Sequence, residues 1–168
     1  MKRILLATVA MLLSFGVFAQ EESKLGRWSQ LDLIGSPSMI ALNTSQGFVY
    51  QDFYFGLSYG IGYNSDKEYL RIGVDSKDSV FGVYIPFYLT IRNDIASGKT
   101  ITPYFEIKSG IQWFCSKRVV VFAVHPTFGI EYKNIQIGTG VQALTCGDVG
   151  GKPYSRTYDL IFSLGYNF

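Results

Sequence analysis

The sequence predicts an all-β fold, an eight-stranded antiparallel up-and-down barrel that spans a membrane. Eight segments alternate between large apolar and small or polar residues, an apolar stretch follows a positively charged N-terminus, and aromatic residues make up 16% of the 168 residues. Eight is the smallest even number of strands found in transmembrane barrels. The aromatic content, with charged residues at only 17%, excludes a disordered chain. A cysteine count of 2 excludes a small disulfide scaffold.

The first nineteen residues have the pattern of a secretory signal peptide. Lys2 and Arg3 precede the apolar stretch 4–18, and Ala19 ends a cleavage site of small residues. We expect cleavage after Ala19, which leaves residues 20–168 as the barrel domain. Removal of the signal peptide takes away two of the 15 basic residues and none of the 13 acidic ones, so the exported chain has a net charge of zero. This balance gives no reason to expect a nucleic-acid partner.

The first three expected strands lie close together along the chain. In 28–34 two leucines alternate with Gln30 and Asp32, and 39–50 follows after a short break. The clearest alternation is in 53–63, where every second residue is large and apolar and where Gly, Ser and one Tyr fill the positions between. A period of two places successive side chains on opposite faces of a β-strand, so each segment has one apolar face.

Five later segments repeat this pattern. On one face they carry mainly Val, Ile, Leu and Phe, and on the other they carry Gly, Tyr, Gln and single charged residues. These expected strands are 83–92, 104–113, 120–132, 135–144 and 158–168.

The composition of the second face favours a membrane barrel over a soluble one. A soluble barrel directs its aromatic face inward and keeps scattered charged residues outside. Here the faces opposite the apolar ones are rich in Gly and Ser, which suit the narrow interior of an eight-stranded barrel. We therefore expect the apolar faces to contact lipid.

The connections and the aromatic residues agree with this orientation. The longest connections, 64–82 and 145–156, follow the third and seventh expected strands, whereas tight turns near 51–52 and 133–134 follow the second and sixth. A barrel with both termini in the periplasm has its long loops after odd-numbered strands. Aromatic residues also fall at two levels, as in the girdles of membrane proteins. At the outer level these are Tyr63, Trp113 and Tyr158, and at the inner level Tyr50, Tyr132, Tyr166 and Phe168.

Several stretches carry a family resemblance. These are FYFGLSYGIGY at 53–63, YIPFYLTIR at 84–92, TPYFE at 102–106 and GYNF at 165–168. With them the chain resembles the small outer-membrane β-barrel proteins of Bacteroidota, which are distant in sequence from the OmpA and OmpX type of barrel. The resemblance implies a Gram-negative outer membrane, contact with its lipid and lipopolysaccharide, and no particular substrate or cofactor. Tyr166 and Phe168 are similar to the C-terminal signal that is read by the outer-membrane assembly machinery.

Charged residues on the inward faces predict a polar network in the barrel lumen. Buried charges are tolerated only when they are paired and hydrogen-bonded. We expect this network to plug the lumen, with Tyr84, Tyr88 and Tyr104 as further members; a narrow small-solute channel is the alternative. The expected network consists of Asp32, Arg92, Glu106, Lys108, His125, Glu131 and Asp159.

The candidates for catalysis and metal binding are few. His125 is the only histidine, which excludes a multi-histidine metal site. With Thr127 and Glu131 it resembles the residue set of barrel lipid A deacylases, whose site must face membrane lipid. Alternation places these three residues in the lumen instead. We therefore expect no catalysis, no metal and no cofactor, with a lipid-modifying enzyme as the alternative.

The expected outer end of the barrel carries two further features. Cys115 and Cys146 follow the fifth and seventh expected strands, and an oxidising compartment permits a disulfide between them although the sixth strand intervenes. The loop 64–79 is rich in charges of both signs and is either a solvated loop or a surface for a partner. The sequence does not indicate an oligomeric state. It predicts an integral outer-membrane protein with a structural or surface-interaction role.

Overall fold

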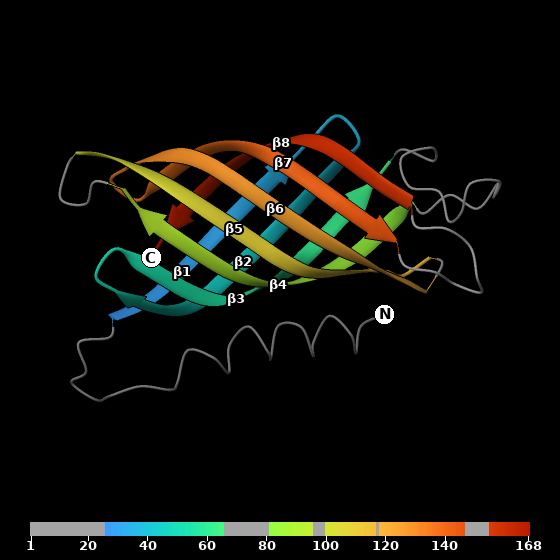
Figure 1. The fold of residues 1–168 in the computed structure, drawn as a ribbon, viewed down its shortest axis with the longest axis horizontal. Helices are drawn as coiled ribbons and strands as arrows, with labels where there is room; N and C mark the ends of the chain where they lie inside the picture. The colour runs from blue at the N-terminus through green and yellow to red at the C-terminus, as the bar shows by residue number, and fades with distance from the viewer. Residues whose placement is uncertain (1–25, 66–80, 96–99, 117, 147–154) are drawn as a thin grey trace.

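The computed structural model describes residues 26–65, 81–95, 100–116, 118–146 and 155–168. They form a closed antiparallel barrel of eight strands in which each strand pairs with its neighbours in sequence and β1 pairs with β8 (Figure 1). The predicted signal peptide 1–19 lies outside the described residues. The strands are β1 (Gly26–Gly35), β2 (Met39–Tyr50), β3 (Phe53–Asn64), β4 (Gly82–Asp94), β5 (Ile101–Phe114), β6 (Val119–Tyr132), β7 (Ile135–Cys146) and β8 (Ser155–Asn167).

The predicted fold class is confirmed, and each of the eight expected segments is a strand. β2 has the predicted bounds, while β4 and β5 are longer than predicted and reach Asp94 and back to Ile101. The two ends of the barrel differ. The short-turn end contains the β2–β3, β4–β5 and β6–β7 connections and the C-terminus, and the long-connection end contains the other connections.

Two of the connections at the short-turn end are two-residue turns. Each begins with a residue in the left-handed region, Gln51 and Lys133, both with φ of 56°. A positive φ in such turns matches the right-handed twist of the paired strands. These two-residue turns are too short to form loops that project from this end of the barrel.

Large apolar side chains cover the outside of the barrel on every strand. Leu57, Ile137 and Leu160 are examples, with exposed fractions of 61%, 59% and 53%. This is the inverse of a soluble protein, in which such side chains fill the interior. The predicted outward faces are therefore confirmed in their direction. Among the described residues, no helix is both long enough and apolar enough to cross a membrane.

The lumen contains two layers of side chains. Towards the short-turn end it holds charged and amide side chains, most of which are nearly inaccessible to solvent, while Glu131 and Asn167 are partly exposed. Towards the long-connection end it holds an apolar layer. Tyr84 and Tyr88 were expected in the lumen, whereas the other members were not predicted as a layer because they lie on faces predicted to be polar. This layer comprises Ile34, Met39, Ala41, Tyr84, Tyr88, Phe114, Val121, Ala123, Leu144 and Ile161.

Glycines leave room for the lumen tyrosines. A Cβ atom on Gly62 would lie 2.2 Å from Cζ of Tyr84, and one on Gly129 would lie 2.6 Å from Cζ of Tyr104. Gly138 pairs with Gly129 in the ladder, and a Cβ atom on Gly138 would lie 2.7 Å from the Tyr104 hydroxyl oxygen. A ring can lie against the wall at these three points only because the wall has no side chain there.

Candidate functional site: the polar lumen

Lys108 of β5 lies at the centre of one buried charge group. Its Nζ lies 2.5 Å from Oδ2 of Asp32 on β1 and 2.9 Å from Oε1 of Glu106. The side chains of the three residues are at most 5% exposed. Gln30 also donates from Nε2 to Oδ1 of Asp32. The structure therefore joins three of the predicted network residues across the lumen.

Arg92 of β4 lies at the centre of a second group nearer the short-turn end. Its Nε and Nη2 lie 2.8 Å from Oδ1 of Asp94, and Nη2 also pairs with Oε2 of Glu131. The guanidinium lies over two rings, with Cζ 4.3 Å from the centroid of Tyr104 and 5.1 Å from that of Tyr54. Cation–π contacts of this kind stabilise a desolvated guanidinium.

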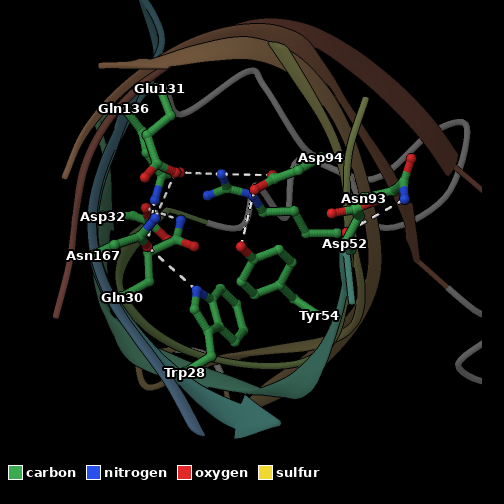
Figure 2. A network of polar contacts seen from close by, with 11 residues as sticks. Trp28, Gln30, Asp32, Asp52, Tyr54, Asn93, Asp94, Glu131, Gln136 and Asn167 are labelled. Atoms are coloured by element: carbon green, nitrogen blue, oxygen red, sulfur yellow. Dashed lines mark hydrogen bonds and ion pairs between the residues drawn. The ribbon is translucent and has the colours of Figure 1, made fainter. Parts of the chain in front are cut away.

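Amide and indole groups link this second group to the barrel wall (Figure 2). Asn167 donates from Nδ2 to Oε2 of Glu131 at 2.7 Å, and its Oδ1 accepts from Nε2 of Gln136 at 2.5 Å and from Nε1 of Trp28 at 3.3 Å. Tyr54 donates from its hydroxyl to Oδ2 of Asp94 at 2.9 Å. The charged residues of the group and the side chains that link it to the wall thus come from six strands, β1, β3, β4, β6, β7 and β8.

His125 is 2% exposed and lies inside the lumen, as alternation predicted. Its ring packs against Tyr88 with the centroids 4.9 Å apart, and Nε2 lies 3.4 Å from the Tyr88 hydroxyl. Gln112 donates to the same hydroxyl at 2.7 Å. Thr127 is also buried in the lumen, whereas Glu131 belongs to the Arg92 group. The structure does not gather these residues at a lipid-facing surface.

Asp159 lies apart from both charge groups. It is on β8 near the long-connection end, where its Oδ2 accepts a hydrogen bond of 2.7 Å from the hydroxyl of Ser38. Tyr84 also differs from the predicted network, since its hydroxyl contacts the sulfur of Met39. The predicted single network is therefore two charge groups, with His125, Asp159, Tyr84 and Tyr88 outside them.

Several buried polar atoms in the lumen have no hydrogen-bond partner among the described residues. They include one guanidinium nitrogen of Arg92, Nδ1 of His125 and several side-chain oxygens. The unpartnered oxygens in the lumen are Gln30 Oε1, Asn43 Oδ1, Glu106 Oε2, Gln112 Oε1, Gln136 Oε1 and Gln142 Oε1. Acceptors thus outnumber donors among the unsatisfied atoms.

The remaining predicted residues lie away from the lumen network. Cys115 follows β5 as an exposed free cysteine, and Cys146 ends β7 with its side chain outside the described part, so the disulfide stays a prediction. Tyr166 and Phe168 are exposed at the short-turn end, with their ring centroids 5.2 Å apart. This placement does not test their predicted role in assembly.

Sequence reasoning missed Asp94 and the amide residues around both groups. Asp94 lies beyond the predicted end of its strand, although it is two residues after Arg92 and therefore lies on the same inward face. Gln30, Gln136 and Asn167 share the inward parity of the charged residues, and this was the available signal. Trp28 shares that inward face too, and the sequence analysis assigned it no role.

Comparison with known proteins gives a fold relationship. No protein-family model and no curated protein sequence matches this chain. Among solved structures, the chain is similar to the crystal structure of Neisserial surface protein A, with a TM-score of 0.50 and 12% sequence identity. The alignment covers 89% of this chain and 100% of that one. At this level of identity the similarity concerns the barrel fold alone.

Proposed function

We propose that this chain is an integral outer-membrane β-barrel protein with a structural or surface-interaction role and without catalytic activity. The observation that carries the proposal is the belt of exposed apolar side chains around all eight strands. Monomeric soluble proteins rarely expose apolar patches larger than several hundred Å². A closed barrel has no free sheet edge and satisfies its backbone internally, which is what a lipid environment requires.

The filled lumen supports a plug rather than a channel. The Lys108 and Arg92 groups occupy the polar half, and the apolar layer around Tyr84 and Phe114 occupies the other half. Both of these aromatic residues are at most 1% exposed. Ions crossing the barrel would have to separate the charge groups and then pass an apolar layer, where their hydration is lost.

The position of His125 supports a non-catalytic role. An enzyme acting on a membrane lipid needs its acid or base at the lipid-facing surface. His125 instead packs against Tyr88 inside the barrel. For the chain to be a lipid-modifying enzyme that uses His125, the barrel wall would have to open between His125 and the surrounding lipid.

The finer parts of the proposal come from the sequence. Residues 1–19 direct export, and Tyr166 and Phe168 engage the outer-membrane assembly machinery during biogenesis. The family is the small Bacteroidota barrels with an OmpA or OmpX type of architecture. The partners of the folded protein are outer-membrane lipid and lipopolysaccharide, met by the apolar belt and by the long-connection end.

Gel migration of the protein from isolated outer membranes tests this proposal. A closed barrel resists SDS until it is boiled, so boiled and unboiled samples should migrate at different apparent masses. Recovery of the protein from the soluble periplasmic fraction, without such a shift, would contradict a membrane location. Planar bilayer recordings with the same material should show no conductance; reproducible single-channel steps would favour the channel instead.

A further inference from the structure

The two charge groups of the lumen each contain one cation and two carboxylates. In the Arg92 group the partners are Asp94 and Glu131, and Glu131 is 17% exposed at the short-turn end, where water reaches it. In the Lys108 group the partners are Asp32 and Glu106, and both are almost completely buried. With all groups ionised, the Lys108 group has one negative charge too many. An uncompensated charge is costly in a low-dielectric interior.

The unsatisfied oxygens lie beside this excess charge. Oε2 of Glu106 has no partner among the described residues, and neither has Oε1 of Gln30 or Oε1 of Gln136. These residues are at most 4% exposed. A buried acceptor without a donor loses the hydrogen bonds that water gave it, at a cost of about 1 to 3 kcal/mol each.

The strand register places Asp32 and Gln136 on either side of a glycine, so that their side chains lie close together. In the ladder, Gly165 of β8 lies between Gln136 of β7 and Asp32 of β1. A Cβ atom on Gly165 would come within 2.5 Å of Oδ1 of Asp32 and 3.6 Å of Cβ of Gln136. Figure 2 shows Gln30, Asp32 and Gln136 extending into the lumen from the same side of the barrel.

We propose that the lumen binds one monovalent alkali cation, of the sodium class, beside Asp32 and Glu106. The amide oxygens of Gln30 and Gln136 supply its further ligands. Hard cations take carboxylate and amide oxygens as ligands, and a single positive charge neutralises the Lys108 group. The inference concerns the lumen alone and does not depend on the proposed surface role.

A monovalent cation fits better than a divalent ion. No three His, Cys, Asp or Glu side chains of the described residues form a metal-binding group, and here only two carboxylates meet. Lys108 already holds one oxygen of each carboxylate, so a second positive charge on the ion would be opposed by the ammonium group.

A proton or water explains the same observations less completely. A proton on Glu106 removes the excess charge, but it satisfies at most one of the unpartnered amide oxygens of Gln30 and Gln136. Water donates to these oxygens but leaves the charge uncompensated. A cation does both.

The test uses the full-length mature chain refolded in detergent micelles. Urea unfolding is followed at equal ionic strength in sodium chloride and in N-methyl-D-glucamine chloride, whose cation is too large for the site. At a sodium concentration of ten times the dissociation constant, the unfolding equilibrium constant should fall about tenfold. Equilibrium dialysis with radioactive sodium should then detect about one bound ion per barrel, because the Lys108 group has a single excess negative charge.

Two matched variants localise the effect. Glu106→Gln removes the excess charge with little change in shape and should abolish the sodium dependence. Glu131→Gln makes the same change in the Arg92 group and should keep it. Should Glu106→Gln fail to fold, Gln30→Met removes one neutral ligand and should weaken sodium binding. Identical unfolding in the two salts would overturn the proposal, as would a sodium effect that Glu106→Gln retains. Stability that responds to pH but not to sodium would assign the charge compensation to a proton.

Discussion

Nζ of Lys108 lies 2.5 Å from Oδ2 of Asp32, although the two residues are 76 positions apart in the chain. They belong to β5 and β1, which are not neighbours in the barrel wall, so the contact crosses the lumen. Glu106 completes the group from the same strand as Lys108. The ion pair thus connects opposite walls of the barrel. Substitution of either partner therefore tests whether the lumen charges stabilise the fold.

Removal of the cation and of one carboxylate should have unequal effects. Lys108→Met leaves Asp32 and Glu106 as two buried carboxylates without a cation, and should destabilise the barrel by about 3 to 5 kcal/mol. Asp32→Asn leaves a balanced pair between Lys108 and Glu106 and should cost much less. Urea midpoints of the two refolded variants check the asymmetry. Equal losses would show that the charges do not act as one group.

The fit of Tyr84 against Gly62 should be visible in a double-mutant cycle. Gly62→Ala places a Cβ atom 2.2 Å from the Tyr84 ring, so the ring must move. We expect a destabilisation of about 1 to 3 kcal/mol from this overpacking. In the background of Tyr84→Leu the same change should cost less, with a coupling of at least about 0.5 kcal/mol. Additive effects would contradict the close contact.

The two tryptophans report on opposite faces of the wall. Trp28 is 4% exposed and faces the lumen, whereas Trp113 is 43% exposed on the outside. In vesicles with brominated acyl chains, Trp28→Phe should leave strongly quenched emission from Trp113. Trp113→Phe should leave emission that is hardly quenched, since bromine atoms do not reach the lumen. The reverse pattern would place the apolar faces inside.

Charged substitutions on the outer face should depend on depth. Leu89 lies in the middle of β4 and Ile135 is the first residue of β7, beside a short turn. Arginine at the bilayer midplane of a barrel costs about 2 to 4 kcal/mol, and near the interface about 0 to 1 kcal/mol. Leu89→Arg should therefore destabilise the folded barrel in vesicles far more than Ile135→Arg. In a soluble protein, both exposed positions would accept arginine equally well.

Substitution of His125 separates a structural from a catalytic role. His125→Gln removes the ring contact with Tyr88 and should lower the free energy of unfolding by about 1 to 3 kcal/mol. The urea midpoint should fall accordingly. Mass spectra of lipid A should be the same in cells with the wild-type protein, with the variant and with neither. A modification that depends on the wild-type protein and is lost in the variant would instead support the enzyme.

The strands and their faces could be predicted from the sequence because alternation is a local property. Residues two positions apart point to the same side of a strand whatever the strand pairs with, so 53–63 already identifies its apolar face. The position of His125 in the lumen follows from the same parity. Short turns at Gln51 and Lys133 likewise need only their neighbours in sequence.

The partners inside the lumen were decided by the tertiary structure. Which residues meet depends on the register of every strand pair around the closed barrel, because each offset changes the height of a side chain along the lumen. Asp159 and Arg92 share the inward parity, yet one bonds Ser38 near the long-connection end while the other bonds Asp94 and Glu131 near the short-turn end. Parity is read within one strand, whereas height is set by all eight, so only the closed barrel shows that the charges form two groups below an apolar layer.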